Sequence, residues 1–376
     1  MQSAPCKAEF SHVQQVLQNY RCTPRYIQKS GNLYKIVADE GIYALKFTTI
    51  AKNRLLSIHS FLRRLRQDGY PHVLPTLSNS EGKSITPTPQ GNWYLTPWKA
   101  SISPEKNRPL SGAVLARSLA KMHRIASPLV KHYQDLAMYP DRAFLRGWNR
   151  QYQAWAADQS QSQPAGESPL RPLWDMYKTR VEQAFSFSTR GMEKFLSAER
   201  GMPPRKTLCH RRIHSSNIVQ GETTFYWVDF DDCGLDSPVR DLALLLHRYS
   251  PDRSGGAVPQ RLLAAYEEEW RLRSREKKLL AIYLAYPERI AKRYKRSRVI
   301  SPSAAPQGTA GSSQQPLPTG DSKPVEVSYS MVGGASKGTL EKSLESIWKS
   351  ELYYLDQLQS MVRSLWSSRS RLGRRG

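Results

Sequence analysis

The period of the hydrophobic pattern changes once along the chain, and this change limits the folds that the sequence can adopt. Between residues 26 and 100, apolar and polar side chains alternate, as in residues 33–37 and 43–47, which predicts paired β-strands. Residues 39–41 supply a turn between these two segments. From about residue 110 the apolar residues recur at helical spacing. The pattern favours an α+β class, with a small antiparallel β-rich unit followed by a larger helical unit.

Helices are predicted wherever apolar residues recur every three or four positions. One such stretch lies inside the β-rich unit, and the others follow it. Ser237 and Pro238 mark a helix start, because serine caps the amino terminus of a helix and proline fits its first turn. The predicted helical stretches are residues 55–65, 115–126, 139–157, 171–198 and the segment after Pro238.

Composition divides the chain into four expected segments. Residues 1–97 form the β-rich N-terminal lobe, and residues 98–300 form the helical lobe. Residues 301–337 are rich in Ser, Pro, Gly, Gln and Thr, and they are too poor in apolar side chains to form a core. A disordered linker is predicted there. Residues 338–376 resume helical spacing and end in a basic tail, which predicts a helix that docks back on the body.

Charge and cysteine content bound the environment and the partners. Lys and Arg number 56 against 32 Asp and Glu, so the formal net charge is +24, which favours binding to polyanions. The 4 cysteines are too few and too scattered for a disulfide framework. Residues 1–10 lack an apolar run, so no secretory signal is expected. No segment is apolar enough to span a membrane, and a cytoplasmic protein is predicted.

One loop and the strand that follows it carry the residues suited to phosphoryl transfer. The loop contains His210, Arg212 and Asn217, and the apolar strand at 225–228 leads into Asp229. Oxygen ligands from Asn217 and Asp229, a short hairpin apart, suit Mg²⁺. The alternative for both residues is a loop-capping role. His210 reads as a structural residue of the loop.

Nearby residues offer competing interpretations. Asp231 and Asp232 fit a turn, with a second metal contact as the alternative for Asp231. Zinc binding by cysteine and histidine side chains is disfavoured, because their spacing matches no common finger or ribbon. The candidate zinc ligands are Cys209, His210, His214 and Cys233.

The motif resembles the signature of the aminoglycoside and choline kinase-like phosphotransferases. That signature is a His-x-Asp-x-x-x-x-Asn loop followed by an apolar strand that ends in aspartate. Residues 284–289 resemble a feature of the CotS-type spore coat branch of the family. The resemblance covers roughly residues 25–297 and implies a protein-kinase-like fold of two lobes. Further segments that resemble the family are residues 30–35, 43–46, 119–123 and 238–243.

The resemblance also implies a cofactor and the residues that bind it. ATP and Mg²⁺ are the implied cofactors if the site is functional. Lys46 corresponds to the lysine that contacts the phosphates, with a solvent-facing strand lysine as the alternative. Asn217 and Asp229 correspond to the metal ligands. The phosphate loop corresponds to Ser30, Gly31 and Asn32.

Two departures from the family pattern put catalysis in question. Arg212 stands where the family has its catalytic aspartate, and an arginine stays protonated and cannot act as a base. Residues 47–67 contain no Asp or Glu, so the helix next to Lys46 lacks the carboxylate that would hold this lysine against the phosphates.

The favoured hypothesis is therefore a pseudokinase with a structural role in the bacterial spore coat, assembled in the mother-cell cytoplasm with other coat proteins as partners. The first alternative is an active ATP-dependent kinase that phosphorylates a hydroxyl of a sugar, an amine alcohol or an aminoglycoside. The second alternative is a basic protein that binds polyanions.

Overall fold

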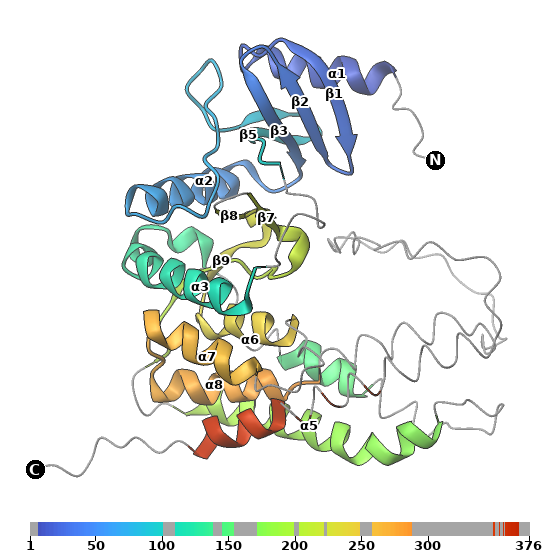
Figure 1. Ribbon diagram of the computed structural model, residues 1–376, viewed down its shortest axis with the longest axis vertical. Helices are drawn as coiled ribbons and strands as arrows, with labels where there is room; N and C mark the ends of the chain where they lie inside the picture. The colour runs from blue at the N-terminus through green and yellow to red at the C-terminus, as the bar shows by residue number, and fades with distance from the viewer. Residues whose placement is uncertain are drawn as a thin grey trace, which may run out of the picture.

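The protein has two lobes, a β-sheet lobe and a helical lobe (Figure 1). The sheet lobe lies at the top of the view, and the helices from α3 onward lie below it. This arrangement agrees with the two-lobed fold that the family resemblance implies. The computed structural model describes residues 7–100, 110–137, 145–153, 171–198, 203–221, 224–248, 258–287, 349, 353, 356 and 358–367.

The sheet lobe is built on one five-stranded antiparallel sheet in the order β1-β2-β3-β5-β4. Helix α1, Lys7–Gln18, adds Val13 and Leu17 to the core of the sheet. The sequence prediction of one helix in this lobe missed α1. The strands are β1 (Pro24–Ser30), β2 (Leu33–Ala38), β3 (Gly41–Thr48), β4 (Thr86–Thr88) and β5 (Gly91–Pro97).

Strand β3 presents its side chains alternately to the two faces of the sheet. Leu45 is fully buried in the core under α1 together with Ile36 of β2. Lys46, the next residue, pairs in register with Leu33 and Tyr94. Because successive side chains of a strand point to opposite faces, Lys46 lies on the face away from that core.

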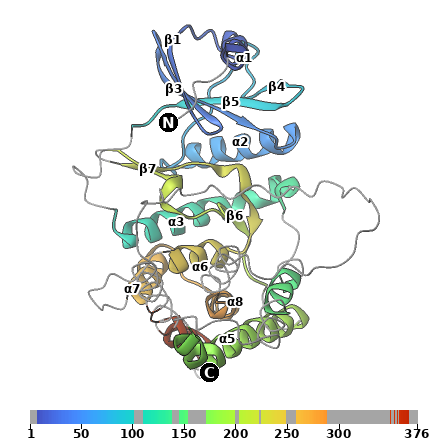
Figure 2. The ribbon, with the colours of Figure 1, turned by 90° about the vertical axis from the view of Figure 1, so that its right-hand side faces the viewer.

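Helix α2, Lys52–Gln67, lies between β3 and β4 of the sheet in sequence, but most of its buried residues pack with the helical lobe. Its residues Ile58, Phe61 and Leu65 are buried in the same core cluster as Leu115 and Leu119 of α3. Figure 2 shows α2 between the sheet and α3. The apolar stripe predicted at 55–65 therefore joins the two lobes.

The helical lobe also contains the short strands and 3-10 turns that carry the loop motif. Two small antiparallel pairs, β6 with β9 and β7 with β8, lie within it. The helices are α3 (Gly112–Ala126), α5 (Arg171–Ser197), α6 (Val239–Arg248), α7 (Val258–Glu269), α8 (Ser274–Ala285) and a helix at 145–153. The 3-10 turns are η2 (Ser127–His132), η3 (Gln134–Leu136), η4 (Ser215–Asn217) and η5 (Phe230–Asp232). The short strands are β6 (Thr207–Cys209), β7 (Ile218–Gln220), β8 (Phe225–Trp227) and β9 (Gly234–Asp236).

The C-terminal helix docks on the helical lobe, as its apolar spacing predicts. Leu358, Met361 and Leu365 are buried in the large core. Arg180 of α5 reaches Asp356 with Nη1 2.8 Å from Oδ1. The predicted linker at 301–337 lies outside the described residues.

Three free cysteines are buried in the described part of the chain. Cys22 belongs to the core of the sheet, whereas Cys209 and Cys233 lie in the helical lobe and are fully inaccessible. Burial raises the pKa of each of these thiols. The described helices include none long and apolar enough to cross a membrane.

Candidate phosphotransfer site

The β7–β8 hairpin brings the two predicted metal ligands to the same end of a strand pair. Ile218 pairs with Trp227, and the Val228 amide donates to the Asn217 carbonyl at 3.0 Å. Asn217 and Asp229 therefore lie just beyond the last paired residues, on adjacent strands. The sequence argument that a short hairpin makes these residues converge agrees with this geometry.

Lys46 meets Asp229 where the two lobes come together. Its ammonium forms an ion pair with Asp229 Oδ1 and a second one with Asp231 Oδ2 at 3.0 Å. The acidic partner that α2 lacks is thus supplied from the other lobe, by η5. The sequence reading treated Asp231 as a turn residue or a metal contact and missed this pairing.

Arg212 occupies the opposite side of Asp229. Its Nη1 lies 3.2 Å from Asp229 Oδ2 and 3.3 Å from Asp232 Oδ2. Each oxygen of the Asp229 carboxylate is therefore bound to a cation, one from Lys46 and one from Arg212. Arginine stays protonated at neutral pH, so the positive charge beside the Asp229 carboxylate is permanent.

The charges of this network shift the pKa values of its members. Burial by itself would raise the pKa of Asp229, but Lys46 and Arg212 outweigh burial and hold this pKa below its ordinary value of 3.8. Burial opposes the charged form of Lys46 as well. The neighbouring Tyr94, Asp231 and Asp229 nevertheless raise the pKa of Lys46 above its ordinary value of 10.5. Both groups are therefore charged at neutral pH.

A buried carboxylate fixes the backbone that carries Arg212. Asp241 of α6 accepts hydrogen bonds from the amides of His210, at 2.6 Å, and Arg211, at 2.8 Å. Arg211 has a φ of 67°, in the left-handed region that non-glycine residues rarely adopt, and these bonds stabilise it there. His210 is buried, and its ring bonds the Val228 carbonyl at 2.9 Å, which agrees with the structural role predicted for it.

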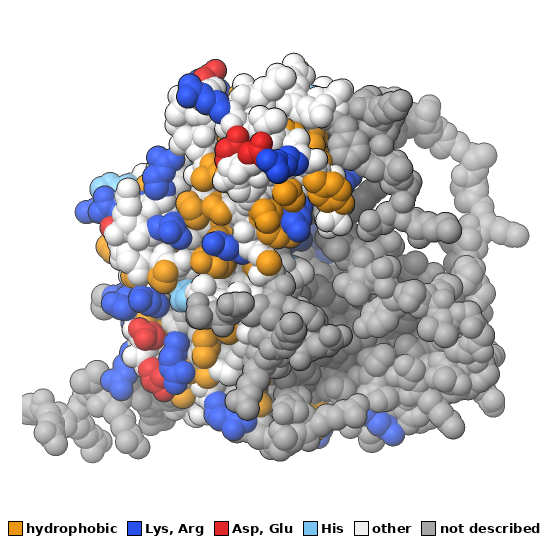
Figure 3. All heavy atoms as spheres, turned by 45° about the horizontal axis from the view of Figure 1, so that its top comes forward, with side chains coloured by type: hydrophobic (Ala, Val, Ile, Leu, Met, Phe, Trp, Pro, Cys, Tyr) orange, Lys and Arg blue, Asp and Glu red, His pale blue; other side chains and the backbone are white. Residues whose placement is uncertain are grey.

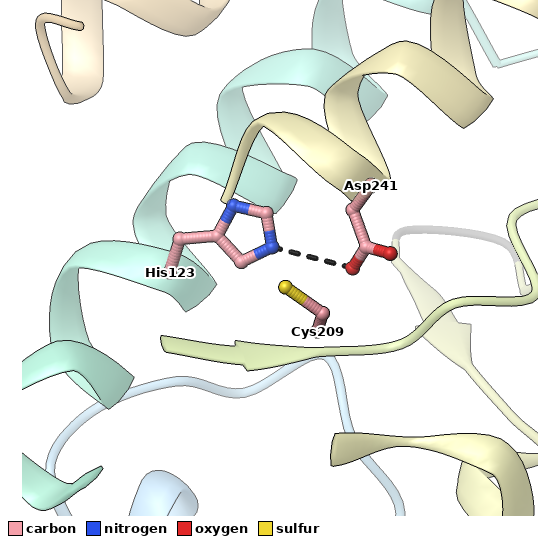
Figure 4. Close-up of side chains that lie close together, drawn as sticks. All are labelled: His123, Cys209 and Asp241. Carbon is pink, nitrogen blue, oxygen red and sulfur yellow. Dashed lines mark hydrogen bonds and ion pairs between the residues drawn. The ribbon is translucent and has the colours of Figure 1, made fainter. Parts of the chain in front are cut away.

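Asp241 also belongs to a fully buried cluster with His123 and Cys209 (Figure 4). Every polar atom of this cluster already has a partner. His123 bonds Asp241 at 3.3 Å and the Tyr266 hydroxyl at 2.8 Å, and the Cys209 thiol donates to the Ser237 carbonyl at 3.3 Å. The cluster therefore holds the loop in place, and it is the one group of metal-ligand residue types that the described residues bring together. The candidate zinc ligands Cys209, His210, His214 and Cys233 do not form such a group among the described residues.

The predicted phosphate loop is a tight two-residue turn between β1 and β2. Ser30 pairs with Leu33, and Gly31 has a φ of 63°, which glycine adopts at little cost. The side-chain amide nitrogen of Asn32 donates to the Phe47 carbonyl of β3 at 3.4 Å. Because Leu33 pairs with Lys46, the turn lies at the same end of the sheet as Lys46. The part of Ser30, Gly31 and Asn32 in nucleotide binding stays a prediction.

Comparison with solved structures supports the kinase-like fold. An aminoglycoside phosphotransferase from Alicyclobacillus acidocaldarius is similar with a TM-score of 0.68 and 14% identity, over 97% of this chain and 98% of that one. The spectinomycin phosphotransferase APH(9)-Ia, solved with ADP and spectinomycin, has a TM-score of 0.54 and 14% identity, over 95% and 97%. A microcompartment-associated aminopropanol kinase has a TM-score of 0.50 and 13% identity, over 96% and 98%.

Comparison of the sequence gives the family. No curated protein matches the chain. The model of the phosphotransferase enzyme family APH matches residues 28–276, which is more than half of the chain. Its matched region contains Lys46, Arg212, Asn217 and Asp229. The chain therefore belongs to the APH phosphotransferase family.

Proposed function

We propose that this protein is a pseudokinase of the APH family, in which Arg212 prevents phosphoryl transfer. The observation that carries the proposal is the position of the Arg212 guanidinium, 3.2 Å from Asp229 Oδ2. A phosphotransferase orients an acceptor hydroxyl with a carboxylate that takes its proton. Arginine holds its protons permanently, so Arg212 repels rather than accepts one.

The expected loss of rate is large. A positioned general base contributes about 10²- to 10⁴-fold to the rate of proton-coupled reactions. In addition, the positive charge of Arg212 offsets the negative charge of the Asp229 carboxylate, which the family uses to bind the metal. Both effects act on the same step, and they make turnover slow even where nucleotide binds.

The remaining residues suit ATP and Mg²⁺. Lys46 would meet the phosphates, and Asp229 and Asn217 would hold the metal with a carboxylate and an amide oxygen, the ligand type that Mg²⁺ prefers. The Asn217 amide nitrogen donates to the Arg212 carbonyl at 2.9 Å, which leaves the amide oxygen to act as a ligand. When bound, the metal would neutralise charge on the phosphates. It has to compete with Lys46 and Arg212 for Asp229.

The cellular role is proposed from sequence resemblance alone. Residues 284–289 resemble the CotS-type spore coat proteins, so a structural role in the spore coat, with other coat proteins as partners, accompanies the pseudokinase proposal. The expected place of assembly is the cytoplasm of the mother cell. Isolation of coat layers, with the protein traced by an antibody, tests this role separately from the chemistry.

The decisive experiment measures phosphotransfer to small hydroxyl acceptors by the wild type and by Arg212→Asp. The wild type should show no turnover above background, and Arg212→Asp should gain some. Arg124→Asp is a matched control, because Arg124 pairs with Glu269 on the surface of the helical lobe and the change in charge is the same. An active wild type would refute the pseudokinase proposal.

A working small-molecule kinase is the second candidate. It is favoured by the contact between Lys46 and Asp229, which keeps the phosphate-binding lysine and the metal-binding aspartate together. The solved relatives are named as aminoglycoside and spectinomycin phosphotransferases and an aminopropanol kinase, which is compatible with phosphorylation of a hydroxyl on a sugar, an amine alcohol or an aminoglycoside. An active wild type that loses its activity in Asp229→Ala would establish this candidate.

Binding to a polyanion is a weaker candidate that rests on the net charge of +24. On the face drawn in Figure 3, the described Lys and Arg side chains are dispersed among apolar and uncharged ones and do not form one patch. Dispersed charge supports weak binding that salt screens. Affinity for polyphosphate that persists at high salt would favour a dedicated polyanion site instead.

A further inference from the structure

Helix α2 contributes a neutral residue to the surroundings of Lys46. Its residue His59 is buried, and its ring packs edge-on against Tyr94 with a centroid distance of 4.8 Å. Burial lowers the pKa of His59 to about 4, so the ring is uncharged at neutral pH. The helix thus packs against the side of Tyr94, the residue paired with Lys46 across the sheet.

Asp231 makes the contacts that a helix carboxylate would otherwise make. Its Oδ2 lies 3.0 Å from Lys46 Nζ, and its Oδ1 accepts a hydrogen bond from the Tyr94 hydroxyl at 2.9 Å. Because Tyr94 is buried, its hydroxyl has little freedom to move. The two oxygens of Asp231 are therefore divided between a partner that fixes the carboxylate and the lysine that it holds.

We propose that Asp231, oriented by Tyr94, is the positioning residue for Lys46 and replaces the carboxylate that α2 lacks. Asp229 is less suited to this task, because its other oxygen is bound to Arg212 and the family uses its carboxylate for the metal. Asp231 keeps its contact with Lys46 when Asp229 turns to another ligand. The inference rests on the proposed function only in taking nucleotide phosphate as the ligand of Lys46.

The first test measures the acid–base state of Lys46 and needs no nucleotide. Acylation by acetic anhydride consumes the uncharged amine, so the pH profile of labelling, followed by mass spectrometry, reports the pKa of Lys46. Loss of the Asp231 charge in Asp231→Asn should move this profile to lower pH and raise labelling about tenfold at a fixed pH. Tyr94→Phe should shift it in the same direction by a smaller amount.

The control for the labelling is Asp68→Asn. Asp68 is also an ion-paired carboxylate, 3.0 Å from Arg64 Nε, but it lies at the end of α2 away from Lys46. Its removal should leave the Lys46 profile unchanged. A general loosening of the protein would also raise the labelling of Lys277, which pairs with Glu267 at 2.9 Å in the helical lobe. A profile that moves in Asp229→Asn and stays fixed in Asp231→Asn would overturn the proposal.

The second test measures the affinity for ADP with Mg²⁺ by calorimetry. Asp231→Asn should bind about tenfold more weakly, since a hydrogen bond to a charged group is lost and Lys46 is no longer held. Asp68→Asn should bind as the wild type does. Unchanged affinity in Asp231→Asn, with the wild type binding, would overturn the positioning role. If the wild type binds no ADP but the labelling profile moves, nucleotide binding fails and the Lys46–Asp231 anchor stands.

Discussion

The hydrophobic core of the sheet lobe is much smaller than the core of the helical lobe. The sheet lobe packs α1 on one face of its strands, with Leu17, Ile36 and Leu45 among the buried residues. The helical lobe has a much larger core, and it takes in Phe61 and Leu65 of α2. A helix that is covalently continuous with the sheet is thus stabilised mainly by the other lobe.

Helix α2 belongs to the sheet lobe by its place in the sequence, but it belongs to the helical lobe by its packing. Helix α2 packs in the helical core, and it contacts the sheet through His59, whose ring packs against Tyr94. Arg54 of α2 also donates to the Cys233 carbonyl at 2.7 Å, next to η5. The site therefore inherits its geometry from the larger core, and the small core adds Lys46.

The largest expected effect comes from truncating α2. Phe61→Ala removes a fully buried ring from the helical core and should lower its free energy of unfolding by about 3–5 kcal/mol. Hydrogen exchange should then show lost amide protection in α3, more than in β2. Leu45→Ala is the matched truncation in the sheet core and should do the reverse. Equal losses in both regions for both variants would make the two cores one cooperative unit.

A smaller effect is expected from the buried carboxylate below the site. Asp241→Asn places an amide where the backbone donors of His210 and Arg211 need an acceptor, and should cost about 3 kcal/mol in the free energy of unfolding. Urea denaturation at neutral pH measures this loss. A loss well under 1 kcal/mol would mean that the loop relaxes, and that the helical lobe does not impose its backbone.

The pH dependence of this variant gives an independent check. Burial alone would raise the pKa of Asp241, but bonds from His123 and the backbone hold it below its ordinary value of 3.8. A depressed folded-state pKa contributes stability that is complete above the unfolded-state value and is lost as the pH falls through the folded-state value. The wild type should therefore lose stability below about pH 4 more steeply than Asp241→Asn does.

A smaller loss of stability is expected when two strands of the sheet lobe are forced apart. A Cβ on Gly91 would lie 2.6 Å from the Thr48 carbonyl oxygen of β3, so Gly91→Ala must push β5 from its neighbour. We expect a loss of about 1–3 kcal/mol, confined to the sheet lobe and measured by exchange of β3 and β5 amides. Gly31 also has a positive φ, but a Cβ there would meet no other atom, so Gly31→Ala measures the backbone cost without the steric contact. Loss of α3 protection in Gly91→Ala would contradict the separation of the two cores.

The smallest effect is expected at the surface contact between α5 and the C-terminal helix. Both Arg180 and Asp356 are exposed to a large extent, so Arg180→Ala should change the free energy of unfolding by less than about 1 kcal/mol. Thermal denaturation measures it. A loss of free energy several times larger would mean that the C-terminal helix docks through charge and not through Leu358 and Leu365.

The sequence predicts the fold better than the site. Alternation at β2 and β3 and helical spacing at α2, α3 and α5 are local signals, and each corresponds to a helix or strand of the structure. The contacts of Asp231 with Lys46 and Tyr94 span more than 130 positions, and no local pattern contains them. The sequence marks the absence of an acid in residues 47–67, but it contains nothing that indicates which residue replaces it.

The three buried thiols give each lobe a chemical reporter of its own. Cys209 and Cys233 are fully inaccessible and can react with a labelling reagent only when the helical lobe opens, whereas Cys22, which is 7% exposed, reports on the sheet lobe. Since burial raises the pKa of all three, the closed protein holds them as unreactive thiols. The rate at which each cysteine is modified therefore records how often its lobe opens, without any probe being introduced.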